Sequence, residues 1–137
     1  MFTVLGGTKK CDECKKEVTG FTEVTMVNAP SVLVISLNRF GDDGAEVGQK
    51  QTAPLELDLT ELYSGFDFQQ GLVMDLFAMV STEGETLEDS ESRAVVLKGE
   101  QWVEFRANST KEVESKDVET EMDPQILFYR ARAGSNE

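Results

Sequence analysis

Apolar residues recur along the chain in short runs and alternations that are typical of β-strands. The β-branched run SVLVISLNRF, residues 31–40, predicts a strand that is buried on both faces. In APLELDLTEL, residues 53–62, leucines alternate with polar residues, which predicts a half-buried strand. The segment GLVMDLFAMV, residues 71–80, predicts a core strand. This part of the chain therefore favours extended structure.

The rest of the chain continues the pattern and adds one polar segment of helical character. AVVLK, residues 94–98, and QWVEF, residues 101–105, predict a hairpin that a glycine turn closes, and PQILFYRARA, residues 124–133, predicts a final strand. The acidic STEGETLEDSES, residues 81–92, predicts a solvated linker, and EVESKDVETEMD, residues 112–123, the helical segment. The expected fold class is α+β but predominantly β, an antiparallel sheet with little helix.

Length and charge narrow the function classes. A chain of 137 residues is long enough for one domain, which buries roughly 65–70% of the surface that its unfolded form exposes. Its net charge of −13 opposes direct binding to nucleic acid or to an anionic membrane, because both reward clustered lysine and arginine. No apolar run is long enough to span a membrane, and we expect no signal peptide. The composition is compatible with a basic protein partner.

The two cysteines of the chain, Cys11 and Cys14, lie in KKCDECKK. This spacing can direct both thiolates to one zinc ion, but two ligands make only half of a tetrahedral site. A closed site therefore needs ligands from a second chain or the weaker oxygen ligands Asp12, Glu13 or Glu17. A degenerate knuckle without metal is the first interpretation, zinc shared with another chain the second, and a redox CxxC pair the third.

Histidine is absent from all 137 residues, so the chain lacks the commonest general base and nitrogen ligand. Aromatic residues instead end several apolar segments. We expect these aromatic residues in the core rather than in a binding site: Phe40, Trp102, Phe105, Phe128 and Tyr129.

The order of these segments resembles the C-terminal half, the fingers and palm, of the ubiquitin-specific proteases. The matching motifs are, in order, CDEC, APSVLVISLNRF, APLELDL, MDLFAMV, QWVEF and ILFYR. The corresponding family motifs include a zinc-knuckle cysteine pair, a strand ending in Arg-Phe, a Trp-Tyr-x-Phe-Asp strand and an Ile-Leu-Phe-Tyr terminus. The resemblance extends from Lys9 to Arg130 and depends on the collinear set, since each motif alone is weak.

The resemblance implies a partial papain-like cysteine protease fold in which residues 1–137 form a single domain. Residues 1–29 correspond to a degenerate fingers hairpin with the CxxC pair, residues 30–132 to a palm-like β core, and residues 133–137 to a frayed tail. In the family, the thumb supplies the nucleophilic cysteine. We expect the thumb to be lacking here, because the sequence begins inside the fingers.

The remaining catalytic positions of the family also carry other residues in this chain. The family histidine falls on Ser92, and the aromatic residue that follows it falls on Arg93. The family's acidic or amide partner falls on Arg106, where a cation repels an imidazolium instead of orienting it. The resemblance therefore implies a pseudoenzyme, and we expect no hydrolysis by this chain alone.

The channel that holds the ubiquitin tail in the family is partly retained. Phe40 keeps the Phe of the Arg-Phe motif, whereas a family lysine falls on Glu46 and an aromatic residue on Arg93. These three positions are the candidate contacts with ubiquitin. The acidic surface complements the basic tail and face of ubiquitin, which favours weak binding.

Three functions follow, in this order. The first is a noncatalytic interaction domain that serves as a scaffold or accessory subunit of a larger assembly. The second is a ubiquitin-binding pseudoprotease or one half of a split deubiquitinase, and the third is a CxxC redox protein. The expected compartment is the cytoplasm or nucleus, although an organelle fits if a targeting peptide has been removed.

Overall fold

The computed structural model describes residues 2–37, 51–62, 71–84, 86 and 88–132. The chain divides into two compact units, and each is described by itself. The first comprises Met1–Ala29 with Asp58–Leu72, and the second comprises Pro30–Leu57 with Val73–Glu137. The single-domain organisation stays a prediction, and the expected frayed tail, residues 133–137, lies outside the described residues. No helix in the described part has the length and apolar character needed to cross a membrane.

The first unit contains a two-stranded antiparallel hairpin. Strand β1, Phe2–Lys10, pairs with β2, Glu17–Val24, and the register shifts between Leu5 and Thr8. The CxxC pair lies in the turn that joins the two strands. This arrangement matches the extended segments expected on either side of the cysteines.

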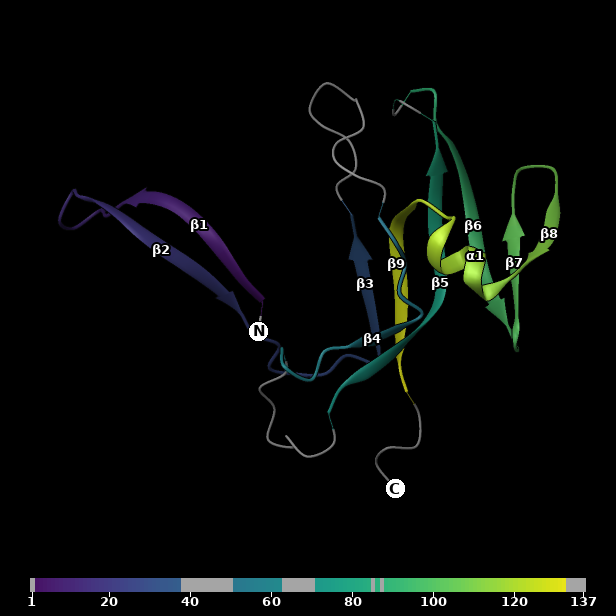
Figure 1. Cartoon of the computed structure of the whole chain (residues 1–137), viewed down its shortest axis with the longest axis horizontal. Coiled ribbons are helices and arrows are strands. Elements are labelled where there is room, and N and C mark those ends of the chain that lie inside the picture. Colours follow the sequence, from purple (N-terminus) through teal and green to yellow (C-terminus); the bar gives the residue numbers. More distant parts are fainter. Residues whose placement is uncertain (1, 38–50, 63–70, 85, 87, 133–137) are drawn as a thin grey trace. The chain divides into compact units, whose positions relative to one another are not determined.

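The second unit is built around one seven-stranded sheet (Figure 1). Its strand order is β3-β9-β5-β6-β7-β8, all neighbouring pairs in this order are antiparallel, and β4 pairs with β5. The elements are β3 Val32–Ser36, β4 Glu56–Asp58, β5 Val73–Glu83, β6 Glu91–Lys98, β7 Gln101–Phe105, β8 Thr110–Val113, α1 Ser115–Thr120 and β9 Pro124–Ala131. The predicted fold class, an antiparallel sheet with little helix, is confirmed.

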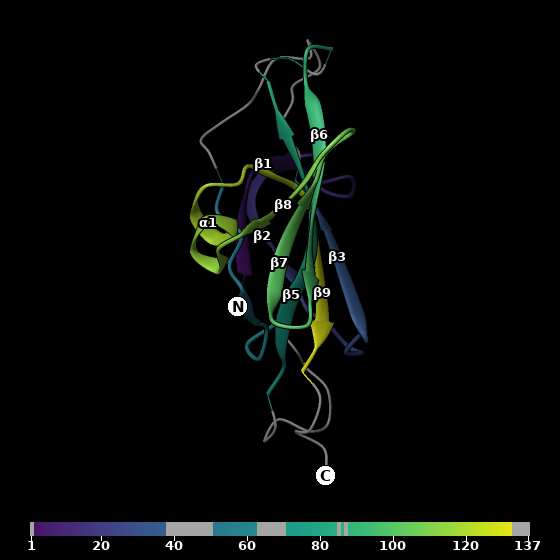
Figure 2. The same ribbon diagram turned by 90° about the vertical axis from the view of Figure 1, so that its right-hand side faces the viewer.

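Alternation along the strands gives the sheet two different faces. On the covered face, cross-strand neighbours form a row of Ile35, Leu127, Met79, Val95 and Glu104. Helix α1 lies on this side of the sheet in Figure 2 and contacts β7. Because side chains of a strand alternate between faces, the intervening residues form a second set on the open face.

The hairpin of β6 and β7 needs a glycine at its turn. Lys98 pairs with Gln101, so that two residues close the loop. The first of them, Gly99, has a φ of 62°, in the left-handed region that a glycine adopts without a steric penalty. The hairpin predicted from the sequence is thereby confirmed.

Tyr129 anchors the centre of the covered face. Its side chain is fully buried, and its hydroxyl donates a hydrogen bond to the carbonyl oxygen of Pro54 at 2.7 Å. Burial raises the pKa of Tyr129 to about 12. The bond ties β9 to the segment that leads into β4, and it satisfies the one polar atom of a large core side chain.

The prediction that residues 31–40 form a strand buried on both faces is wrong. Strand β3 is an edge strand whose residues alternate between half-buried and exposed. Val32 and Val34 are 49% and 54% exposed. A β-branched run satisfies the preferences of a strand, but no second layer covers one side of β3 among the described residues.

The predicted acidic linker, residues 81–92, is also corrected. Strand β5 extends to Glu83 and β6 begins at Glu91, and Ser81 and Thr82 are buried. Strand β8 was not predicted, because TKEV has no apolar run and becomes a strand by pairing with β7. Both segments are rich in polar side chains, so their sequences do not predict strands. The backbone hydrogen bonds of the sheet stabilise the strands there.

The aromatic residues expected in the core divide between the two faces. Trp102 and Tyr129 are buried, as predicted. Phe105 and Phe128 are only half-buried and lie on the open face, so the core prediction fails for them. Phe40 lies outside the described residues.

Candidate functional site

Ser92 and Arg106, which the resemblance aligns with the family's catalytic histidine and its partner, lie at one end of the β6–β7 hairpin. Ala94 pairs with Phe105, so Ser92 precedes this pair on β6 and Arg106 follows it directly after β7. Ser92 is exposed, and Arg106 is half-buried. The register thus brings together two positions that the sequence separates by a strand and a turn.

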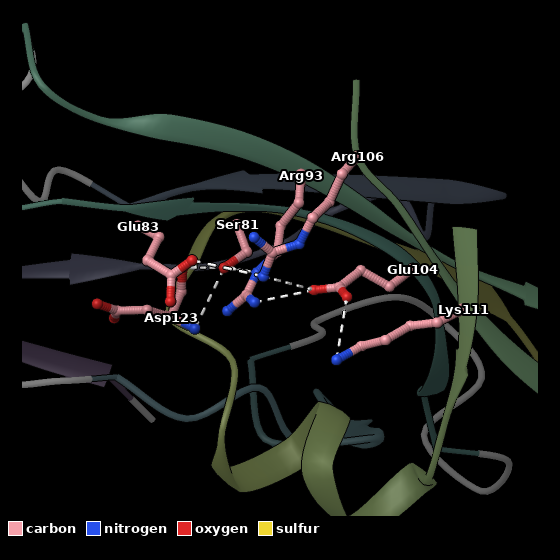
Figure 3. A network of polar contacts seen from close by, with 7 residues as sticks. All are labelled: Ser81, Glu83, Arg93, Glu104, Arg106, Lys111 and Asp123. Atoms are coloured by element: carbon pink, nitrogen blue, oxygen red, sulfur yellow. Dashed lines mark hydrogen bonds and ion pairs between the residues drawn. The ribbon is translucent and has the colours of Figure 1, made fainter. Parts of the chain in front are cut away.

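A buried carboxylate, Glu104, lies at the centre of this end of the sheet (Figure 3). Its side chain is only 1% exposed. Arg93 Nη1 donates a hydrogen bond to Glu104 Oε1 at 2.8 Å, and Arg106 Nη2 lies 3.6 Å from the same oxygen. Lys111 Nζ lies 3.5 Å from Oε2. Three cations on β6, β8 and the end of β7 therefore converge on one carboxylate.

A second layer of hydrogen bonds holds the arginines in place. Arg93 Nε donates to Ser81 Oγ at 3.4 Å, and Ser81 Oγ donates to the carbonyl oxygen of Asp123 at 2.9 Å. Arg106 Nη2 donates to Glu83 Oε2 at 3.4 Å. The network therefore connects β5, β6, β7 and the segment before β9, which fixes the orientation of both guanidinium groups (Figure 3).

The electrostatics of Glu104 favour its ionised form. Burial is the largest influence and raises the pKa, but the charges of Arg93, Arg106 and Lys111, with the hydrogen bond from Arg93, together hold the pKa below its usual range. Oε2 is buried without a hydrogen-bond partner, and only the ion pair with Lys111 compensates it. A buried carboxylate is costly to leave unpaired, so removal of its cations should destabilise the fold.

This arrangement is a network of ion pairs and hydrogen bonds around one carboxylate. The two positions that the resemblance assigns to the family's catalytic histidine and its partner carry a serine hydroxyl and a guanidinium, those of Ser92 and Arg106. Arg106 is directed to Glu104 and Glu83 and neutralises them.

The CxxC turn is well ordered by its backbone hydrogen bonds. Cys11 donates its N–H to the carbonyl oxygen of Lys16 at 2.9 Å, and Lys15 donates to the carbonyl oxygen of Cys11 at 2.9 Å. Lys15 adopts a φ of 58°, which closes the turn. The backbone N–H of Cys14, then that of Glu13, and the Cys14 side chain lower the pKa of the Cys11 thiol.

The turn offers half of a metal site. Cys11 and Cys14 are both free thiols. Among the described residues, no group of three or more His, Cys, Asp or Glu side chains is arranged to hold a metal ion. The oxygen ligands considered from the sequence, Asp12, Glu13 and Glu17, are exposed and belong to no such group. Zinc shared with another chain stays a prediction.

Of the three candidate contacts with ubiquitin, only Arg93 lies in the described part of the chain; Phe40 and Glu46 lie outside it. Arg93 is engaged with Glu104 and Ser81. Sequence reasoning missed both of these partners. A signal for Glu104 existed, because in QWVEF it alternates in phase with Trp102 and so shares the covered face. A charge in phase with core residues indicates a buried ion pair.

Comparison with known proteins agrees with this geometry. The profile of the family described as ubiquitin carboxyl-terminal hydrolase matches residues 4–129. A search of curated protein sequences gives no match.

Several similar solved structures belong to one multi-subunit module. The SAGA DUB module Ubp8/Sgf11/Sus1/Sgf73 bound to monoubiquitin matches with a TM-score of 0.70 at 21% identity, covering 96% of this chain and 30% of that chain. The module bound to ubiquitin aldehyde gives 0.70 at 22% identity, covering 96% and 31%. The yeast SAGA module with a variant Sgf73 gives 0.68 at 24% identity, covering 79% and 26%. The chain therefore spans less than a third of the solved chains it matches.

Proposed function

Because the chain belongs to the ubiquitin carboxyl-terminal hydrolase family, we propose that it is a noncatalytic, ubiquitin-protease-like interaction domain that acts as a scaffold or accessory subunit of a larger assembly. One observation carries the proposal. Where the family places a histidine and its acidic partner, this chain has Ser92 and an Arg106 that is ion-paired with Glu104 and Glu83. The position holds a structural network in place of an acid–base pair.

The proposal explains why a charged network persists at this edge. A buried ion pair seldom adds stability over an apolar pair of the same size, but removal of one partner is costly. The Arg93–Glu104 pair joins β6 to β7, and Lys111 on β8 extends it to the sheet's edge. A network of this kind fixes strand register and shape, which suits a domain whose surface is recognised by other proteins.

The similar solved structures support a protein partner. Their Ubp8 chains share this fold and are assembled with Sgf11, Sus1 and Sgf73. For this chain we infer membership of an assembly of the same general kind, with protein contacts rather than nucleic acid or membrane. The net charge of −13 favours that choice.

A hydrolysis assay tests the proposal. The purified chain is incubated with ubiquitin that carries a C-terminal fluorogenic amide, and separately with ubiquitin that carries a thiol-reactive C-terminus. We expect no fluorophore release above buffer and no covalent adduct at Cys11 or Cys14. Turnover that Ser92→Ala or Arg106→Ala abolishes would overturn the noncatalytic assignment.

A second candidate is a ubiquitin-binding pseudoprotease or one half of a split deubiquitinase. It is favoured because two of the similar structures are bound to ubiquitin or ubiquitin aldehyde. A titration of isotope-labelled ubiquitin with this chain tests it. Saturable shifts at the ubiquitin tail, weakened by Phe40→Ala, support this candidate, whereas unchanged spectra at high protein concentration leave the scaffold subunit.

A redox function of the CxxC pair is the third candidate. The lowered pKa of the Cys11 thiol supports it. Reversible formation of a Cys11–Cys14 disulfide in a glutathione buffer, lost in Cys14→Ser, is the required result. Free thiols on this turn also suit a reducing compartment, and we propose the cytoplasm or nucleus.

A further inference from the structure

The open face of the seven-stranded sheet is apolar across its strands. Strand register places one row of side chains on this face: Val34, Phe128, Ala78, Val96 and Val103. The next row consists of Ile126, Val80, Ala94 and Phe105. The two rows define the open face. From β3 to β7 neither row contains a charged side chain, and on β8 the first row ends at Glu112.

Within the second unit, no described element covers these rows. Along β5, β7 and β9, the open-face residues are half-buried while their neighbours on the covered face are buried. At the β3 edge, Val34 is 54% exposed and Val32, beside the first row, is 49% exposed. Helix α1, the helix of the described residues, lies on the covered side (Figure 2). A contiguous apolar surface of this kind is typical of a protein-binding site.

Two cations lie over the aromatic rings of the open face. Lys98 Nζ is 5.3 Å from the centre of the Phe105 ring, and Arg130 Cζ is 5.6 Å from the centre of the Phe77 ring. Phe77 in turn packs against Phe128, with ring centres 6.3 Å apart. Each cation therefore borders the apolar rows and presents its charge to solvent.

These cations are notable in so acidic a chain. The sequence has 26 acidic and 13 basic residues. Among the described residues, neither Lys98 nor Arg130 forms an ion pair, whereas Asp75, the cross-strand neighbour of Arg130, is hydrogen-bonded to Arg132. Glu112 is the other acidic residue in phase with the face, and it lies at the β8 edge.

We propose that the open face binds an amphipathic helix of a partner protein, whose apolar stripe packs on the two rows and whose flanking carboxylates reach Lys98 and Arg130. The inference rests on the proposed role as an interaction domain and names its surface and the chemistry of its partner. Helices are the elements that cover sheet faces, as α1 does on the other side, whereas strands add at edges.

Charge selects this occupant over a second copy of the chain. Two copies each carry a net charge of −13 and repel one another. A symmetric pairing of open faces would also bring the same cations towards each other. An acidic helix instead supplies the opposite charge at both positions, which sets its orientation and excludes basic helices.

Fluorescence anisotropy with two labelled helical peptides tests the proposal. Both peptides carry the same leucine stripe, flanked by glutamate in one and by lysine in the other, and the titrant is the full chain. We expect saturable binding of the glutamate peptide, about tenfold tighter than that of the lysine peptide, a difference typical of charge complementarity. No saturation with either peptide, or equal affinity for both, overturns the proposal.

Matched variants localise the site. Val34→Glu should weaken the glutamate peptide about tenfold or more, because it adds a negative charge to the apolar row. Val18→Glu, at a 46% exposed strand valine in the other unit, should leave the affinity unchanged. The double variant Lys98→Glu/Arg130→Glu should bind the lysine peptide more tightly than the glutamate peptide. The control Lys116→Glu in α1 should keep the preference for the glutamate peptide. Circular dichroism confirms the fold of each variant, and equal effects of Val34→Glu and Val18→Glu overturn the proposal.

Two further readouts separate the alternatives. Sedimentation of the free chain detects a second copy, and a dimer that Val34→Glu dissociates would overturn the helix as occupant. The hydrolysis assay on the same sample reports on the proposed function alone. An inactive chain with flat peptide titrations therefore overturns the open-face inference while the noncatalytic assignment stands.

Discussion

The covered and open faces of the seven-stranded sheet are built from similar side chains but differ in burial. Leu127 on the covered face is buried, whereas its neighbours Ile126 and Phe128, which point to the other side, are half-buried. The covered face accommodates a charged residue, Glu104, inside a network of three cations. The open face carries its cations at the border and none in its rows.

The difference shows that apolar composition and burial are separate properties. A strand places alternate residues on opposite faces whether or not a second layer is present. Burial then depends on what lies above each face, which here is α1 on one side only. On the covered face, the burial of apolar side chains stabilises the fold. On the open face, the same kind of side chain can still be buried by a partner, and that burial would stabilise a complex.

The largest expected difference between the faces comes from truncation of neighbouring residues. Leu127→Ala should lower the free energy of unfolding by about 3 kcal/mol, because it leaves a cavity in a close-packed layer. Ile126→Ala, one residue away on the open face, should cost about 1 kcal/mol, since solvent fills the space. Urea unfolding of both variants measures the contrast, and equal losses would mean that the open face is covered in the isolated chain.

The next difference concerns charge. Glu104→Gln should cost about 2 kcal/mol, because it leaves Arg93 half-buried without a counter-charge. Glu112→Gln, at an exposed position in phase with the open face, should change stability by less than about 0.5 kcal/mol. Thermal and urea unfolding give both values. A loss in Glu112→Gln as large as that in Glu104→Gln would contradict the structural role assigned to the network.

Tyr129→Phe tests the hydrogen bond at the centre of the covered face. Loss of the bond to Pro54 should cost about 1 kcal/mol. Because the folded pKa is raised to about 12, wild-type stability should also fall as the pH rises from about 10, the unfolded pKa, towards 12. Unfolding at pH 8 to 11 checks both effects, and the variant should show a shallower alkaline decline. If Tyr129→Phe loses stability at alkaline pH as steeply as the wild type, other groups cause the decline.

The smallest expected effect is the loss of stability at acidic pH that carboxylates on each face contribute. The pKa of Glu104 is lowered, and so is that of Asp75, chiefly by its hydrogen bond from Arg132. Each carboxylate therefore stabilises the fold above its unfolded pKa, about 4, and loses that contribution as the pH falls through the folded pKa. The difference between wild type and Asp75→Asn should shrink on acidification from pH 7 to 3, and that for Glu104→Gln should shrink further. If the stability of each variant and of the wild type falls in parallel on acidification, the ion pairs do not contribute as proposed.

Local patterns predicted most of the strands correctly. The alternation in GLVMDLFAMV and PQILFYRARA indicated β5 and β9, and Gly99 indicated the turn between β6 and β7. These features depend on backbone preference and on side-chain period, which are properties of a few adjacent residues. The family's motif order was equally local, and the family match over residues 4–129 confirms the resemblance.

Strand register and layering decided what the patterns left open. Ser81 and Thr82 looked like linker residues, yet β5 continues through them because β6 pairs with it. The alternation in QWVEF places Glu104 on the covered face but does not identify Arg93 as its partner, because the two are eleven residues apart and the hairpin register brings them together. A contact between strands requires the whole sheet, so no local preference specifies it.

By itself, the sequence therefore determined most of the strands, the absence of histidine and the family to which the chain belongs. Only the tertiary structure decided that β3 is an edge strand with exposed valines and that Arg106 binds carboxylates. The physical reason is that the alternation of a strand divides its side chains into two sets, and this division does not depend on distant residues. Which set is buried depends on the layer that packs against it.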